Sequence, residues 1–474
     1  MKQRQPIARK HKKQNIMWIR PLEREGGARY QQIARQVINA VDDGVLKPGD
    51  RLPAQRELAN TMGVDLTTVT RAYKELRLAG LLEAHGAGGS YIASYLGNNE
   101  QIIDLSMNIP PLLGVDGFSR RMGSSLSYMR DHADDASLMS YHVGAGSRFD
   151  REAAASWLVP IFGELDPDQL LISAGAQPAI SAIILAYSRP GDSIVAEKLT
   201  YPGFLAACRV LQRQVLPVET DDEGMLPDDL ERVCKENKPK IIYVVPTISN
   251  PTATTMSLAR RQAIYDIAVR YDIAIIEDDP YWLLAGDAPL PIAALAQDSR
   301  RAPVFYISTV SKCLAPGLRT AYVLLPTLES TEKIQEALRA IMLMPNQSTV
   351  SMTSHLIRNG SAKEILQGLR RELSQRQEIA SGIIPGIRQA HPHGLHLWLE
   401  LPEYVDQYRL IQSAQEQGLG VASSEAFCVQ EQSANALRIS LGGAKDQHGL
   451  TIALEKLADI LRGVEKKPQR QIIV

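Results

Sequence analysis

The sequence contains few cysteines, and they are arranged neither to bind a metal nor to form a disulfide framework. Cys208, Cys234, Cys313 and Cys428 are the only four in 474 residues, and no C-x-x-C pair occurs. This usage fits a reducing compartment and argues against a structural zinc site. Apolar runs are also short, since none approaches the roughly 18 residues that span a bilayer. We therefore expect a cytoplasmic protein that holds no metal and has no membrane contact.

The sequence also lacks an excess of either charge. Lys and Arg number 52 and Asp and Glu 53, which excludes a wholly basic or polyacidic protein. Residues 1–27 hold eight cations and two anions (+6), and residues 28–94 hold eight cations and seven anions (+1), which leaves −8 for residues 95–474. We expect residues 1–27 to be a flexible basic arm that contacts a polyanion. A solubilising tail is the simpler interpretation, and a start at Met17 would remove most of the arm.

Residues 28–94 have the pattern of three helices followed by a hairpin. Apolar residues recur at helical spacing in three stretches, of which the second is predicted to begin near Pro53 and the third to end at Gly80. Two short strands, 81–84 and 90–93, then enclose a glycine-rich loop. This order is the layout of a winged helix-turn-helix.

The polar face of the third helix carries hydroxyls and cations, which can bind phosphates and base edges of DNA. Three motifs accompany it: L-K-P-G-D-R-L-P-A-Q-R-E-L-A, G-V-D-L-T-T-V-T-R-A-Y, and L-A-G-L-L-E before the glycine-rich loop. Together they resemble the GntR family of bacterial transcription regulators, which implies binding to a double-stranded DNA operator. The implied DNA-binding residues are Arg56, Thr67, Thr68, Thr70, Arg71, His85 and Gly86. Leu66 departs from the polar residue usual in the family, so a base contact is lost there or replaced by a thymine methyl contact. A helical module with a solvated polar face is the plain alternative.

Residues 95–103 are predicted to be a short linker, and residues 104–474 an α/β domain. Continuous apolar runs typical of buried parallel strands occur at 170–172, 193–196, 241–245, 273–276, 304–307 and 322–325. Helical stretches between them predict a mostly parallel sheet with helices on both faces. Residues 104–474 are more than a domain with a single hydrophobic core usually contains, so we also expect a smaller C-terminal lobe.

Polar residues gather just after these strands, at the edge of the sheet where ligands bind. Residues 173–178 open a helix whose free N–H groups suit a phosphate. Asn250 begins an Asn-Pro-Thr turn, carboxylates occupy 277–279, and Lys312 lies between small polar residues seven positions before Arg319. Each piece alone is readily explained as a turn or a helix cap. Their order on successive strands makes coincidence improbable.

This set is similar to the fold-type I pyridoxal-phosphate (PLP) enzymes, specifically the class I aminotransferases, over almost all of residues 104–474. The resemblance implies that Lys312 is the catalytic residue, which forms a Schiff base with the PLP aldehyde. It implies that Asp278, by its D-x-x-Y spacing to Tyr281, is the anion that faces the ring nitrogen. The other implied cofactor-binding residues are Gly175, Ala176, Gln177, Tyr201, Asn250, Tyr281, Thr309, Ser311, Arg319 and, lent across a homodimer interface, Tyr141. Arg438 matches the residue that binds the carboxylate of a substrate or effector.

Two residues depart from the aminotransferase pattern. Ala176 replaces the Ser or Thr common in the phosphate loop, and Ala253 replaces the Gly usual after Asn-Pro-Thr. Neither change removes the lysine that forms the covalent link, so we expect cofactor binding to persist.

A GntR-like head in front of an aminotransferase-like body resembles the MocR family of bacterial regulators. The resemblance implies a homodimeric, PLP-dependent transcription regulator that senses an amino acid, an amine or PLP. A ligand that favours one domain arrangement would change operator affinity by its differential affinity for the two states. Two alternatives stay open: a working class I aminotransferase that carries a DNA-binding head, and an enzyme remnant kept for dimerisation.

Overall fold

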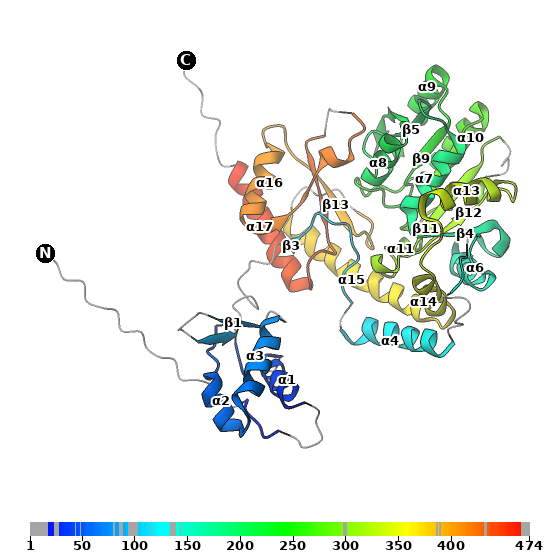
Figure 1. Ribbon diagram of the computed structural model, residues 1–474. Coiled ribbons are helices and arrows are strands. Elements are labelled where there is room, and N and C mark those ends of the chain that lie inside the picture. The colour runs from blue at the N-terminus through cyan, green and yellow to red at the C-terminus, as the bar shows by residue number, and fades with distance from the viewer. Residues whose placement is uncertain are drawn as a thin grey trace, which may run out of the picture. The chain divides into compact units, whose positions relative to one another are not determined.

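The computed structural model describes residues 18–22, 28–42, 44–47, 49–78, 81–84, 89–92, 103–113, 115–132, 139–142, 144–296, 301–384, 387, 390–430 and 434–465. The chain divides into an N-terminal unit, residues 1–102, and a C-terminal unit, residues 103–474 (Figure 1). Most of the predicted basic arm, most of the predicted linker, and the loop residues His85 and Gly86 lie outside the described residues.

The N-terminal unit is three helices and a hairpin around a small apolar core. Its elements are α1 (Arg29–Asp42), α2 (Gln55–Met62), α3 (Leu66–Leu78) and the antiparallel strands β1 (Leu82–Ala84) and β2 (Ser90–Ile92). The core is made by the apolar faces of the helices and includes Ile33, Val37, Leu58 and Val69. Helix α2 begins two residues later than predicted, because Pro53 precedes it in non-helical backbone and its carbonyl accepts a hydrogen bond from the buried Tyr73 hydroxyl at 2.8 Å.

A seven-stranded sheet forms the centre of the C-terminal unit, with strand order β4-β12-β11-β10-β9-β5-β6. The strands are β4 (Leu170–Ser173), β5 (Ser193–Glu197), β6 (Gln214–Val218), β9 (Ile241–Val244), β10 (Ala274–Asp278), β11 (Val304–Thr309) and β12 (Ala321–Leu324). The sheet is mostly parallel, as predicted, but β12, whose apolar run was counted among the candidate parallel strands, pairs antiparallel with both β11 and β4. The apolar run of β12 correctly predicts a buried strand. Such a run does not reveal whether the strand is parallel or antiparallel to its neighbours. Strand β6 was not predicted, because it lies at the sheet edge and its residues are only partly buried.

Helices cover both faces of this sheet (Figure 1). Successive strand residues point to opposite faces, so Ile241 and Tyr243 join the core on one face while Ile242 and Val244 join the core on the other. The flanking helices and short elements are α4 (Val115–His132), α6 (Arg148–Phe162), α7 (Ala176–Tyr187), α8 (Pro202–Val210), β7 (Thr220–Asp221), β8 (Gly224–Met225), α9 (Pro227–Asn237), α10 (Leu258–Tyr271), α11 (Trp282–Ala285), α12 (Ile292–Leu295), α13 (Ser330–Met342) and α14 (Gln347–Arg358).

A smaller lobe with its own core follows the main sheet. Its antiparallel strands are β13 (His396–Glu400), β15 (Ala422–Ser423) and β16 (Ala436–Ser440), and its helices are α15 (Ser361–Ile383), α16 (Gln407–Glu416) and α17 (Gln447–Glu465). The first strand of the unit, β3 (Ile103–Asp104), pairs with β14 (Leu419–Gly420) of this lobe. The predicted fold class, a winged helix-turn-helix with an α/β body and a C-terminal lobe, is confirmed. No helix in the described part of the chain is both long and apolar enough to cross a bilayer.

Candidate functional site

A cavity of about 400 Å³ opens where the strands of the main sheet end, a size within the usual range for small-molecule sites. Strands β4, β10 and β11 each lead into its wall, and the C-terminal lobe closes it with residues near β15 and β16. The structure brings together most of the predicted site residues in this wall: Ala176, Gln177, Tyr201, Asn250, Asp278, Tyr281, Thr309, Ser311, Lys312, Arg319 and Arg438.

Lys312 carries the only primary amine in this wall. It follows β11, and its Nζ donates a hydrogen bond to the backbone carbonyl of Asn108. Burial, followed by the nearby Arg438, lowers the pKa of the amine to about 8, with Asp278 opposing both effects. At pH 7 about a tenth of the amine is therefore neutral, and the neutral form is the nucleophile that attacks an aldehyde.

Asp278 ends β10 and has one carboxylate oxygen engaged. Its Oδ2 accepts a hydrogen bond from the Tyr243 hydroxyl at 2.8 Å, whereas its buried Oδ1 has no partner among the described residues. Burial raises the pKa of Asp278 to about 7. The adjacent Asp279 is used differently, since it accepts from the Thr247 hydroxyl at 2.8 Å and from the Trp282 N–H at the start of α11 at 3.0 Å. Asp278 is therefore the carboxylate that can face a cationic ring.

Asn250 is oriented by Arg438. Arg438 Nη1 donates to Asn250 Oδ1 at 2.8 Å, which leaves the Asn250 amide N–H groups available to the cavity. Arg438 Nη2 donates to the carbonyl of Ser106. Burial lowers the pKa of the guanidinium from its ordinary value, but this group stays charged. The cavity therefore holds a cation suited to a ligand carboxylate.

The first turn of α7 forms a cup for an anion. Gly175 precedes the helix with φ 98°, and a Cβ there would lie 2.5 Å from Arg319 Nη2, so only glycine leaves room for that guanidinium. Thr309 and Ser311 add hydroxyls that are hydrogen-bonded to each other at 3.0 Å. Free N–H groups, hydroxyls and an arginine together fit a phosphate.

The donor set of the cavity fits PLP. Asp278 Oδ1 is a buried acceptor that no described residue engages, as a protonated ring nitrogen requires. The Tyr201 ring packs directly against Gly203. A Cβ at Gly203 would lie 2.4 Å from atoms of this ring, so a larger residue would displace it. An aromatic ring there suits stacking on a flat cofactor. Fold and cavity together define a protein of the fold-type I class, whose members use PLP.

Comparison with known families agrees with this class. The family described as aminotransferase class I and II matches residues 100–457, and the bacterial regulatory GntR family matches residues 29–92. The chain belongs to the class I and II aminotransferase family, whose members use PLP, and it carries a GntR-type region in front of that domain. The predicted MocR-type arrangement is therefore confirmed.

Some relatives align with both parts of the chain along nearly their whole length. The chain is 28% identical to an uncharacterized HTH-type transcriptional regulator, YdeF of Bacillus subtilis, over 94% of this chain and 98% of that protein. It is 28% identical to the vitamin B6 salvage pathway transcriptional repressor PtsJ of Salmonella typhimurium, over 87% and 94%. Among solved structures, the kynurenine aminotransferase of Pyrococcus horikoshii is similar with a TM-score of 0.69 and 26% identity, over 79% of this chain and 94% of that one.

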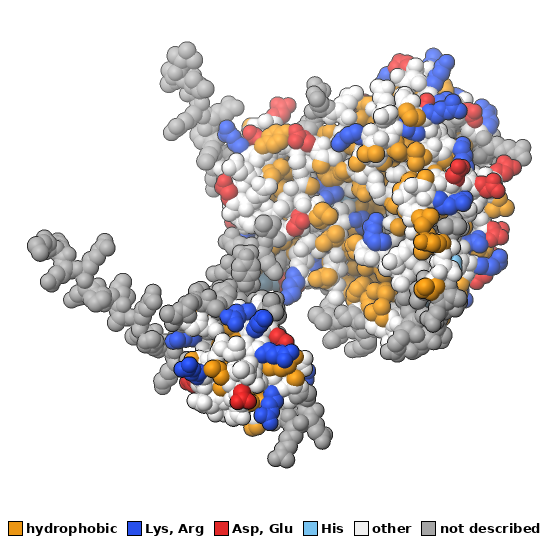
Figure 2. Space-filling view, viewed as in Figure 1, with side chains coloured by type: hydrophobic (Ala, Val, Ile, Leu, Met, Phe, Trp, Pro, Cys, Tyr) orange, Lys and Arg blue, Asp and Glu red, His pale blue; other side chains and the backbone are white. Residues whose placement is uncertain are grey.

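In the N-terminal unit, the predicted DNA-binding residues that the structure describes lie largely in the open. Arg56, Thr67, Thr70 and Arg71 are exposed, and Thr68 is partly buried. Lys and Arg side chains lie at several places on the face of this unit in Figure 2.

Tyr30 in α1 orients Arg71. The Arg71 guanidinium stacks 3.9 Å above the centre of the Tyr30 ring and donates to its hydroxyl at 3.2 Å. This contact holds the cation beside the polar face of α3, where its charge is available to a phosphate.

Two of the predicted cofactor-binding residues, Gly175 and Tyr141, do not line the cavity. Gly175 is one residue before the cavity-lining Ala176, and it shapes the cup rather than lining it. Tyr141 is 77% exposed and does not line the cavity of its own chain. Its role across a dimer interface stays a prediction.

Sequence reasoning missed several cavity residues, above all Asn108, Ser106 and Phe427. Asn108 lies in an irregular segment and is separated by 173 residues from Tyr281, to which it bonds. Tyr243 was assigned to the strand core, although its hydroxyl holds Asp278. No local pattern marks these residues, because their contacts arise from packing.

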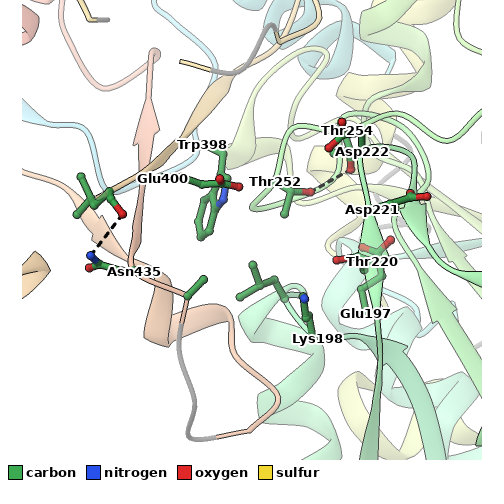
Figure 3. Close-up of a pocket in the computed structure, with 14 residues that line it drawn as sticks. Glu197, Lys198, Thr220, Asp221, Asp222, Thr252, Thr254, Trp398, Glu400 and Asn435 are labelled. Carbon is green, nitrogen blue, oxygen red and sulfur yellow. Dashed lines mark hydrogen bonds between the residues drawn. The ribbon is translucent and has the colours of Figure 1, made fainter. Parts of the chain in front are cut away.

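A second cavity, of about 370 Å³, lies elsewhere in the C-terminal unit (Figure 3). Its wall includes Trp398 and Glu400 of β13, with Thr252 and Asp221 across the cavity. Asp221 is already paired with Arg260, at 2.8 Å. None of the predicted site residues lines this cavity, so it is distinct from the predicted cofactor site.

Proposed function

We propose that this protein is a transcription regulator whose N-terminal unit binds operator DNA and whose C-terminal unit binds PLP and senses an amino acid or amine. The observation that carries the proposal is the intact aminotransferase-type cavity in a chain that begins with a GntR-type unit. An enzyme has no need of such a unit, whereas a ligand-responsive regulator needs both parts.

The residues of the cavity have separate tasks toward the cofactor. The cup at α7, with Arg319, would hold the phosphate, Asp278 would face the ring nitrogen, and Lys312 would form the covalent link. Bound PLP supplies a reactive carbonyl carbon and an electron sink. Arg438 would orient a ligand by its carboxylate, so the expected effector is an amino acid or a related amine with an acid group.

Residues 103–108, here called the lead-in segment, support coupling between cavity and DNA-binding unit. They directly follow the residues that join the two units in sequence, and Ser106 and Asn108 line the cavity. The carbonyls of these two residues accept hydrogen bonds from Arg438 and Lys312. A ligand that engages either cation changes the partners of the lead-in segment, and this gives the ligand differential affinity for two states.

The lead-in segment is held tightly to the C-terminal lobe. Leu105 O accepts a hydrogen bond from Ser440 N at 2.7 Å, and Leu105 N donates to Gly420 O at 2.7 Å. A Cβ at Gly443 would lie 1.7 Å from Asp104 O, so glycine is needed for this approach. Movement of the lobe would therefore move the segment. We further propose a cytoplasmic homodimer, in which Tyr141 reaches the partner's cofactor phosphate.

DNA binding by the full-length protein tests this function. Bound sites are first mapped across the genome, and one site is then titrated at fixed salt without PLP, with PLP, and with PLP plus single amino acids. We expect sequence-specific binding whose affinity changes severalfold with PLP or with one ligand. Absence of specific binding under all conditions would overturn the proposal.

The second candidate function is aminotransferase catalysis, favoured by the complete set of cavity residues around Lys312. Steady-state assays with amino acid and keto acid pairs distinguish the two. A turnover of roughly 1–1000 per second would establish an enzyme. Slow single half-reactions, together with ligand-dependent DNA binding, would establish a sensor.

A further inference from the structure

Asn108 has a fixed amide orientation. His396 Nε2 lies 3.0 Å from the carbonyl of Ser249, which only accepts hydrogen bonds, so Nε2 carries the proton. Burial lowers the pKa of His396 to about 3, which keeps the ring neutral and makes Nδ1 an acceptor. Nδ1 lies 3.2 Å from Asn108 Nδ2, so the amide nitrogen of Asn108 faces the histidine.

The same nitrogen sets the hydrogen-bond role of Tyr281. Asn108 Nδ2 has two hydrogens, and its second one is donated to the Tyr281 hydroxyl at 2.8 Å. The hydroxyl oxygen therefore accepts from Asn108, and its own hydrogen must point elsewhere. Among the described residues no hydrogen bond takes up that hydrogen, and Tyr281 lines the cavity.

We infer that Asn108, held by His396, is a positioning residue. It turns the hydroxyl hydrogen of Tyr281 toward the phenolate oxygen on the PLP ring. This inference rests on the proposed binding of PLP. A hydrogen-bond donor to that oxygen stabilises the negative charge of the oxygen. It thereby lowers the pKa of the proton that the oxygen would share with the Lys312 nitrogen. Without Asn108 the Tyr281 hydroxyl hydrogen can turn away from the phenolate oxygen. The pKa of the proton at the Lys312 nitrogen should therefore rise.

A pH titration of the cofactor absorbance in the full-length, PLP-loaded protein tests the inference. In Asn108→Leu, which keeps the branched shape of the side chain but removes the amide, we expect the midpoint of this titration to rise by about one pH unit. The charged groups whose fields reach Lys312 are Asp278, Arg438 and Arg319, and none is altered. Asn108→Ser, which restores a small donor, is expected to recover part of the shift.

The double variant with Tyr281→Phe separates a positioning role from a general loss of packing. If Asn108 acts through Tyr281, the midpoint of Asn108→Leu/Tyr281→Phe equals that of Tyr281→Phe alone. An unchanged midpoint in Asn108→Leu, or additive shifts in the double variant, would overturn the inference. If the unaltered protein shows no lysine-linked cofactor absorbance, the proposed function fails instead, so the two failures are distinguishable.

Discussion

Replacing Asp278 by Asn is expected to stabilise the cofactor-free protein. Asp278 is 4% exposed, its Oδ1 has no partner among the described residues, and burial raises its pKa from an ordinary 3.8 to about 7. That difference corresponds to about 4 kcal/mol of destabilisation by the buried charge. Asn keeps the shape and can still accept the hydrogen bond from Tyr243, so the variant removes the charge with little change in packing.

The pH dependence follows from the direction of this shift. The folded-state pKa lies above the unfolded value, so folding is favoured by protonation, and the destabilisation is absent below the unfolded pKa. It grows as the pH rises and is complete above the folded-state pKa. We expect Asp278→Asn to gain about 4 kcal/mol near pH 8 but only about 2 kcal/mol near pH 5.

Denaturant unfolding of the cofactor-free protein at both pH values, followed by tryptophan fluorescence, measures this gain. The matched control is Asp168→Asn. Its carboxylate is exposed, and a hydrogen bond from Arg151 holds its pKa below the ordinary value, so this variant should not gain stability. Equal stability of Asp278→Asn and the unaltered protein near pH 8 would refute the assignment of a buried, uncompensated carboxylate. With PLP present, the advantage should reverse, because the ring nitrogen loses its anion.

Four further variants test the lysine, the DNA-binding face and the coupling. Lys312→Ala should abolish the borohydride-reducible link to PLP, and an unchanged absorption spectrum would refute the assignment. Arg71→Ala should weaken DNA binding and make the salt slope shallower by about one unit, as measured by titration over a salt series. Tyr30→Leu should give a smaller effect, because it removes the ring and the hydroxyl that orient Arg71 but leaves the charge of Arg71 in place. Gly443→Ala should displace Asp104, cost about 1–3 kcal/mol in the C-terminal unit, and reduce the ligand response of DNA binding while leaving ligand-free binding intact; an unchanged response would argue against coupling through the lead-in segment.

Much of the fold was predictable because its signals are local. The apolar runs of β9, β10 and β11 and the helical periodicity of α1 and α3 depend on neighbouring residues in the chain. The antiparallel direction of β12 was not predictable, because the choice of partner strand and its direction depend on distant segments. The edge strand β6 was not predicted either, because its residues are only partly buried and its apolar pattern is correspondingly weak.

The site shows the same division. Asp278 ends β10, and Lys312 and Arg319 lie in the short segment between β11 and β12, so their arrival at one edge of the sheet follows from sheet architecture. Asn108 and His396 carry no motif, and each is fixed by a partner more than a hundred residues away. Their roles emerge only when the chain is folded.

The sequence by itself therefore determined the two-part organisation, the family and the chemical groups around the cavity, because covalent neighbours and periodicity encode these features. Only the tertiary structure decided which oxygen of Asp278 has no partner in the described part of the chain, which way the Asn108 amide faces, and that the lead-in segment contacts Lys312 and Arg438. Hydrogen bonds require atoms within a few tenths of an ångström of a preferred distance, and packing of segments far apart in the chain sets that precision.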